Sequence, residues 1–257
     1  MTKAVTKQPL QWAAKPSPGQ CIPGLEYFTG RPQMHLKQKI DVLEMVVGWE
    51  QTNKFRITDP KTGEVIGMFK EQSSACSRQC CKNMRGFNAQ VVDAQGEIIF
   101  KMERPFKCSF CGGFCCQCDS DSCCASQQIY VYGRNGENLG SVIQQKGARG
   151  LGWLGCCCCL DWNVSVKDGK GNGRYVMRND ICSLQCGFDD KHLPILDSSG
   201  SSSVGALTKK WRGCATECCT IADALLIDFP NDADEAMKAV VVAACLLSDY
   251  NIWERKD

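Results

Sequence analysis

The sequence has little histidine, almost no net charge and no signal for export. Only 2 of its 257 residues are histidine, and 30 basic residues nearly balance 28 acidic ones, for a formal charge of +2. This balance argues against an electrostatic nucleic-acid binder, and a hydrophobic content of 44% argues against a disordered chain. Without a nucleophile–base pair, two histidines also leave little capacity for general-base catalysis. We therefore expect a folded protein that is not an enzyme and has no direct nucleic-acid partner.

Cysteine, by contrast, is in excess. The chain contains 21 cysteines, and an odd number leaves at least one thiol unpaired. Residues 1–20 hold no apolar run of the roughly 7–15 residues that a secretory signal contains. We therefore expect no export, and hence reduced thiols, because the cytosol opposes stable disulfides.

The chain divides into a short leader and one long β-rich region. Residues 1–24 carry several prolines and few large apolar side chains, which predicts a flexible leader. We place a single domain over residues 25–257. From about residue 40 it consists of short apolar runs separated by turn signals, which are typical of antiparallel hairpins.

Five pairs of alternating runs are joined by turns of the D-x-x-G, N-G or D-G kind, a strong hairpin signal. The turns lie at residues 59–63, 93–96, 134–136, 168–169 and 197–200, and their glycines recur every 31–40 residues. Together with a leading hairpin near residues 42–50, they predict about twelve strands, arranged as a propeller or a closed barrel.

The C-terminal region has a helical pattern instead. Acidic residues between 232 and 235 precede an apolar run over residues 236–247 and suit the N-terminal dipole of a helix. Because the run is apolar almost all round, it must be buried in protein or in lipid. Its uninterrupted part, residues 239–247, is far shorter than the ~20 residues that span a bilayer. This favours a helix that plugs the barrel over a membrane anchor.

Most of the cysteines are clustered, and their spacing leaves three interpretations open. Cys108 with Cys111, and Cys115 with Cys118, have the spacing of zinc knuckles, whereas adjacent cysteines in an extended chain point in opposite directions. The same cluster lies among phenylalanines and glycines, a setting that suits acylation, and several acyl chains give stable anchoring. Free cysteines can also be small core residues, the interpretation we favour for Cys245. We assign no role to the run Cys156–Cys159.

Motifs along most of the chain resemble the phospholipid scramblase family. They are Cys21-Ile-Pro-Gly-Leu-Glu-Tyr27, Leu43-Glu44, Gly48-Trp-Glu50, Asn53-Lys54, Cys76-Ser-Arg-Gln-Cys80-Cys81, Glu103-Arg-Pro105, Gly205 to Trp211, Phe229-Pro-x-Asp232-x-Asp234 and Met237-Lys-Ala-Val240. The resemblance implies a tubby-like fold, mainly β, in which a closed twelve-stranded antiparallel barrel surrounds a central apolar C-terminal helix. It also implies bidirectional, ATP-independent and calcium-stimulated movement of phospholipids between leaflets, at the cytoplasmic face of the plasma membrane.

The resemblance also implies three kinds of site. The S-palmitoylated cluster of the family falls on Cys108, Cys111, Cys115, Cys116 and Cys118. In the calcium loop only Asp223 and Asp232 match, while Ile221 replaces an acidic ligand and Leu226 the turn glycine, so calcium binding should be weak or absent. An importin-binding nuclear signal falls on Lys209, Lys210 and Trp211, although a basic patch on a strand is often only a solvated face.

We therefore predict a membrane-associated phospholipid scramblase whose partner is the phospholipid membrane. The alternatives are an acylation-tethered regulatory protein, which enters the nucleus when it is not acylated, and a thiol–metal protein. The proline-rich region that offers SH3 and WW ligands in longer family members is reduced here to a stub, so we do not expect such partners.

Overall fold

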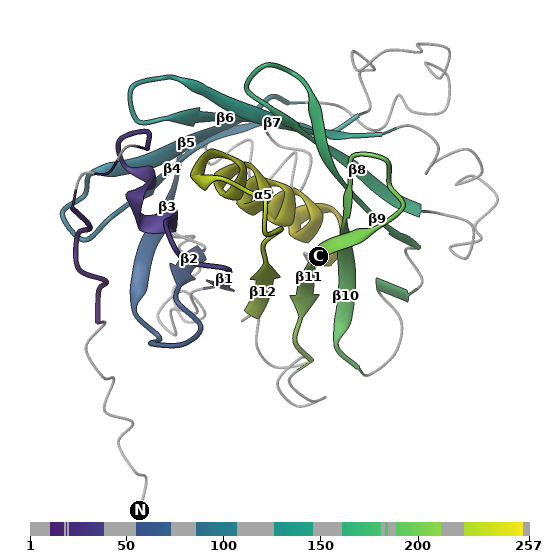
Figure 1. Ribbon diagram of the computed structural model, residues 1–257, viewed down its shortest axis with the longest axis horizontal. Coiled ribbons are helices and arrows are strands. Elements are labelled where there is room, and N and C mark those ends of the chain that lie inside the picture. Colours follow the sequence, from purple (N-terminus) through teal and green to yellow (C-terminus); the bar gives the residue numbers. More distant parts are fainter. Residues whose placement is uncertain are drawn as a thin grey trace, which may run out of the picture.

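Twelve antiparallel strands close into one barrel around a helix in the part of the chain that the computed structural model describes (Figure 1). The described residues are 11–17, 19, 21–38, 55–72, 86–106, 126–145, 161–180, 183–184, 189–211 and 224–253. The predicted fold class is confirmed, and the barrel is closed rather than a propeller.

The strands follow one another around the barrel in chain order. They are β1 (Gln33–Gln38), β2 (Phe55–Thr58), β3 (Val65–Gln72), β4 (Phe87–Val92), β5 (Ile98–Arg104), β6 (Gln128–Gly133), β7 (Asn138–Gln144), β8 (Asp161–Asp168), β9 (Gly173–Asp180), β10 (Lys191–Asp197), β11 (Ser203–Lys209) and β12 (Ala224–Asp228).

The five hairpins predicted from turn signals are all present, as β2–β3, β4–β5, β6–β7, β8–β9 and β10–β11. In the β4–β5 turn, for example, the carboxylate of Asp93 accepts hydrogen bonds from the backbone N–H groups of Gln95 and Glu97, and Gly96 has a φ of 79°. Glycine suits this left-handed conformation, because a side chain would be strained there.

The remaining two strands differ from the sequence prediction. The hairpin expected near residues 42–50 lies outside the described residues. The last pair is instead β1 with β12, two strands from opposite parts of the chain, in which Met34 pairs with Ile227. Closure depends on this long-range pairing, which no local turn signal could reveal.

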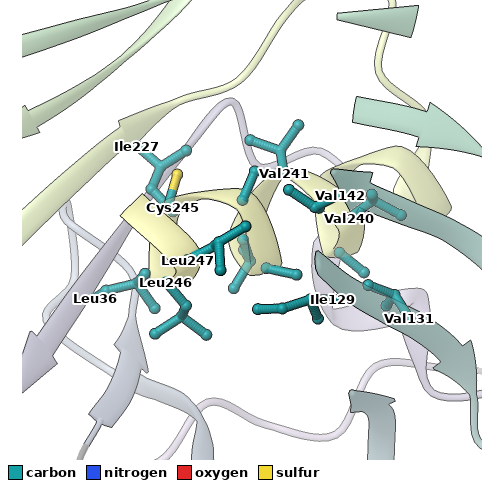
Figure 2. Packing of buried hydrophobic residues seen from close by; sticks show 14 of the residues in the cluster. Leu36, Ile129, Val131, Val142, Ile227, Val240, Val241, Cys245, Leu246 and Leu247 are labelled. Atoms are coloured by element: carbon teal, nitrogen blue, oxygen red, sulfur yellow. The ribbon is translucent and has the colours of Figure 1, made fainter. Parts of the chain in front are cut away.

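The helix α5 (Glu235–Ser248) begins inside the predicted acidic stretch and continues as a π-helical turn, η6 (Asp249–Trp253). The side chain of Asp234 caps α5 by accepting a hydrogen bond from the N–H of Met237, at 2.7 Å. Figure 2 shows apolar side chains of the helix, such as Val240 and Leu247, among those of the surrounding strands.

Every residue of α5 from Ala239 to Ser248 is buried, which explains why the run is apolar on all sides. Each fully buried Val or Leu contributes roughly 1.5–3 kcal/mol relative to exposure. By length and composition, the 19 residues from Glu235 to Trp253 could cross a membrane, but most of them lie inside the barrel. Burial in protein, the favoured interpretation, is what the structure shows.

Residues before β1 also contact the barrel. The short 3-10 helix η1 (Leu25–Phe28) buries Phe28 completely. Further upstream, Trp12 forms a bridge with Val65, and Ala13 is buried. The predicted boundary between a leader over residues 1–24 and a domain over residues 25–257 stays a prediction.

Candidate functional site at one end of the barrel

The antiparallel order gives the barrel two different ends. At the turn end lie the five hairpin turns and the beginning of α5. At the loop end, odd-numbered strands finish and even-numbered strands begin, as the pairs Gln38–Phe55 and Phe87–Arg104 illustrate. All the long connections of the chain therefore leave and enter the barrel at the loop end.

Almost all the cysteines belong to these long connections. Those between β3 and β4, β5 and β6, β7 and β8, β9 and β10, and β11 and β12 contain three, seven, four, two and three cysteines, which is 19 of the 21. The predicted acylation residues, Cys108, Cys111, Cys115, Cys116 and Cys118, lie outside the described residues, as does the run Cys156–Cys159. The strands that flank each segment end and begin at the loop end.

The remaining two cysteines lie elsewhere. Cys21 is partly exposed, upstream of η1, and Cys245 is completely buried in α5. Burial, with a smaller contribution from the charge of Asp249, raises the pKa of the Cys245 thiol. The thiol therefore stays protonated, and the prediction that Cys245 is a core residue is confirmed.

A buried arginine lies beneath the loop end. The side chain of Arg104, the last residue of β5, is only 1% exposed. Its Nη2 donates a hydrogen bond to Oε1 of Gln127 at 2.9 Å, and its guanidinium lies over the rings of Phe87 and Tyr250, 5.8 and 5.6 Å from their centroids. A charge this deep must be compensated by such contacts, because burial of an unpaired charge is costly.

Sequence reasoning missed this position, although a signal was present. Phe100 and Met102 are buried in β5, and strict alternation then turns Arg104 inward as well. The Glu103-Arg-Pro105 motif was used only for the family resemblance, without a role for its arginine.

The C-terminal end of the helix adds a second polar contact at the loop end. Trp162, near the start of β8, donates from Nε1 to Oγ of Ser248 at 3.0 Å, and this hydroxyl donates to the carbonyl oxygen of Ala244 at 2.9 Å. All three groups are buried, so the contact fixes the depth of the helix in the barrel. No motif in the sequence indicated this pair, because its members are 86 residues apart.

Two large apolar side chains are exposed among the described residues, and both lie at the loop end. Phe106 follows β5 and is 56% exposed, and Trp211 follows β11 and is 38% exposed. The other large apolar side chains that the structure describes are buried or partly buried.

The turn end is charged and polar instead. Glu97 forms ion pairs with Lys15 at 2.7 Å and with Arg134 at 3.0 Å. Partial burial alone would raise the pKa of Asp59, but hydrogen bonds from the backbone and from Arg31 hold it below the usual value. These groups stabilise short turns, and Lys15 and Glu97 are about half exposed to water.

The residues of the predicted calcium loop fall into different structures. Leu226, in the place of the turn glycine, lies inside β12 and pairs with His35 on one side and Thr208 on the other. Asp232 lies at the turn end, where its carboxylate accepts a hydrogen bond from the Tyr175 hydroxyl at 2.9 Å. Ile221 and Asp223 lie outside the described residues. Within the described ranges, no cluster of three or more potential metal ligands is found.

The predicted nuclear-import residues lie at the loop end and contact the rest of the protein. The Lys209 ammonium lies 5.6 Å from the ring centroid of Trp253. Lys210 forms an ion pair with Asp190 at 2.7 Å, and the same carboxylate accepts a hydrogen bond from the Trp211 backbone N–H at 2.9 Å. The segment is therefore held against the barrel.

These features define a class of protein: a closed antiparallel barrel filled by its own apolar helix, with a charged end and a cysteine-rich end. Within that class, the chain belongs to the Scramblase family, whose model matches residues 13–255. The family resemblance inferred from the motifs is thereby confirmed.

Individual relatives match along nearly the whole chain. Phospholipid scramblase 1 of Homo sapiens is 32% identical over 246 residues, which cover 95% of this chain and 70% of the relative. Phospholipid scramblase 1 of Rattus norvegicus is 33% identical, with 94% and 66% covered, and phospholipid scramblase 4 of Homo sapiens is 29% identical, with 96% and 69% covered. The chain thus spans about two thirds of the length of these relatives. No solved structure matches it significantly.

Proposed function

We propose that this protein is a membrane-associated phospholipid scramblase that moves phospholipids in both directions between leaflets without ATP. The observation that carries the proposal is the match of residues 13–255 to the Scramblase family, together with relatives named phospholipid scramblases. It is transport rather than bond-making chemistry, in keeping with a sequence that has only two histidines.

The loop end is the membrane-facing end in this proposal. The strands around it tether the cysteine-rich connections, including Cys108, Cys111, Cys115, Cys116 and Cys118, which we propose to be palmitoylated. One acyl chain binds a membrane only marginally, whereas two or more give stable anchoring, so a cluster of sites suits this role. We propose the cytoplasmic face of the plasma membrane as the site of this anchoring.

Calcium plays at most a weak part. An EF-hand loop needs oxygen ligands and a glycine at a sharp turn, whereas Leu226 is in the middle of a strand ladder. Asp232 already accepts a hydrogen bond from Tyr175 and contacts Arg174, and these contacts compete with a cation. We therefore propose scrambling that does not require calcium.

We also propose, as a secondary role, that the protein enters the nucleus when it is not acylated. Non-acylated protein would leave the membrane and present Lys209, Lys210 and Trp211 to importin. Because Asp190 holds the last two of these residues, the segment has to detach from the barrel before it can bind in an extended form.

The test is reconstitution of the purified chain in liposomes that carry a fluorescent phospholipid. Dithionite bleaches only the outer leaflet, so scrambling appears as bleaching beyond the outer-leaflet fraction. We expect extra bleaching with or without calcium. Bleaching limited to the outer leaflet in both conditions would contradict the proposal and favour the acylation-tethered regulatory protein.

The anchoring is tested in cells. Replacement of Cys108, Cys111, Cys115, Cys116 and Cys118 by alanine should remove thioester labelling from these positions and move the protein from the membrane to the soluble fraction. Replacement of Cys21 by alanine is the matched control, because this residue lies away from the loop end. Unchanged membrane partition of the five-cysteine variant would contradict the anchoring role.

A further inference from the structure

We infer that Phe106 and Trp211 are two interfacial anchors that dock the loop end on an anionic phospholipid surface with the barrel axis close to the membrane normal. This inference deepens the proposed function and rests on it. It names side chains that bind the bilayer in addition to any acyl chains.

The first observation is exposure. Single apolar side chains on a surface are common and need no explanation. Here, however, the exposed large hydrophobic residues of the described ranges are these two, at 56% and 38%, and both lie at the same end of the barrel. The two exposed residues therefore share the end of the barrel from which the long connections leave.

The second observation is their position on the rim. Phe106 follows β5 and Trp211 follows β11, and these strands are six places apart in a ring of twelve. Strands β5 and β11 are therefore on opposite sides of the barrel, and Figure 1 shows these two strands on opposite sides of α5. A single anchor would leave the barrel free to rock in every direction, whereas two anchors on opposite sides of the rim restrict rocking along the line that joins them.

The chemistry of the two positions points to lipid. Aromatic side chains favour the boundary between headgroups and acyl chains, and indole also has a polar N–H for the wet side. In the sequence each aromatic residue is followed by a basic one, Lys107 and Arg212, and basic residues next to a membrane are attracted to anionic lipids.

The backbone at one of the two anchors, Trp211, is also held in place. The backbone N–H of Trp211 donates to Asp190 at 2.9 Å, and the neighbouring Lys210 binds the same carboxylate at 2.7 Å. A fixed backbone reduces the entropy that an anchor loses when it inserts.

The test is sedimentation of the purified, non-acylated full-length chain with vesicles of phosphatidylcholine, with or without phosphatidylserine. We expect Phe106→Ala and Trp211→Ala each to weaken binding to the phosphatidylserine vesicles about three- to tenfold, as the loss of one partly buried aromatic ring implies. The double variant should show roughly the product of the two factors. Trp211→Phe should bind much as the wild type does.

Tyr132→Ala is the control, because Tyr132 is a half-buried aromatic residue on the wall, in β6. It should bind like the wild type. Unfolding temperatures of all variants verify that the fold is intact, which the exposure of both anchors leads us to expect. Wild-type binding by both single variants, or an effect of only one of them, would overturn the inference.

Lipid transport in the same vesicles distinguishes a failure of the docking inference from a failure of the proposed function. If the wild type scrambles and neither aromatic variant changes binding, the docking inference is wrong while the proposed function stands. If binding depends on both aromatic residues but no scrambling occurs, the proposed function is wrong while the docking stands.

Discussion

The two ends of this barrel differ in the length of their connections and in the side chains that they expose or bury. The turn end has short turns whose carboxylates accept hydrogen bonds from backbone N–H groups or pair with partly exposed basic residues, as Asp59 and Glu97 show. The loop end has long cysteine-rich connections, a buried arginine beneath them and exposed aromatic residues at its rim. The difference teaches that polar groups are satisfied in different ways along the barrel axis. At the turn end they pair near the surface, whereas at the loop end Arg104 and Ser248 make buried contacts beneath the rim.

The largest expected effect is at the buried arginine of the loop end. Arg104→Ala should lower the free energy of unfolding by about 3 kcal/mol or more, because it opens a cavity and leaves the amide of Gln127 without this donor. Urea denaturation measures the loss. Arg104→Met, which keeps most of the volume, should be less damaging and separates packing from hydrogen bonding.

Lys15→Ala is the turn-end counterpart, since Lys15 is a half-exposed partner of Glu97. We expect no measurable change in the urea midpoint, because exposed ion pairs contribute little. If Lys15→Ala and Arg104→Ala lowered the free energy of unfolding equally, the expected difference between the two ends would be wrong.

A smaller effect is expected where the helix meets the barrel wall. Ser248→Ala should cost about 1–3 kcal/mol, because Nε1 of Trp162 then remains buried without its acceptor. The hydroxyl of Thr29, which donates to Glu235 at 2.9 Å in an exposed contact at the turn end, is the matched control. Thr29→Val should change the free energy of unfolding by less than about 0.5 kcal/mol. A Ser248→Ala variant as stable as the wild type would show that the buried hydroxyl does not matter.

The helix cap at the turn end should contribute about 1 kcal/mol, the usual cost of removing an N-cap side chain. Asp234→Ala removes the acceptor of the Met237 N–H, whereas Asp234→Ser keeps one. Thermal unfolding should therefore rank the wild type and the serine variant together, above the alanine variant. A serine variant as unstable as the alanine variant would mean that the charge, and not the cap, is important.

The smallest effect depends on pH. Because hydrogen bonds in the folded state lower the pKa of Asp59, the stability that its carboxylate provides is present above its unfolded pKa, near 3.9. It is lost as the pH falls through the lower folded value. Asp59→Asn should therefore be less stable than the wild type at pH 7, by about 1 kcal/mol or less. The two proteins should converge once the pH is below the folded pKa of Asp59, and a difference that stays constant as the pH falls would contradict the assignment.

Much of this organisation could be predicted from the sequence. Hairpins follow from local turn chemistry and alternation, so five pairs of strands and the apolar helix were predictable. The pairing of β1 with β12 was not, because it joins strands that no turn connects. Strand alternation pointed to the inward side chain of Arg104, but its contact with Tyr250 depends on the depth of a distant helix.

The candidate site was predictable only in part. Its cysteines were visible as clusters, but only the antiparallel order of the strands shows that the connections containing them all leave the barrel at one end. The exposure of Phe106 and Trp211 depends on neighbours far away in the sequence, and an isolated apolar residue in a sequence is normally expected to be buried.

Hydrogen exchange on the vesicle-bound protein tests most directly whether the loop end faces the membrane. Backbone amides are compared with and without phosphatidylserine vesicles, at the loop end around residues 104–106 and 209–211 and in the turns at residues 59–64 and 93–97. The account predicts slower exchange on vesicles at the loop end and unchanged exchange in the turns. Protection of the turns, with the loop end unchanged, would contradict it.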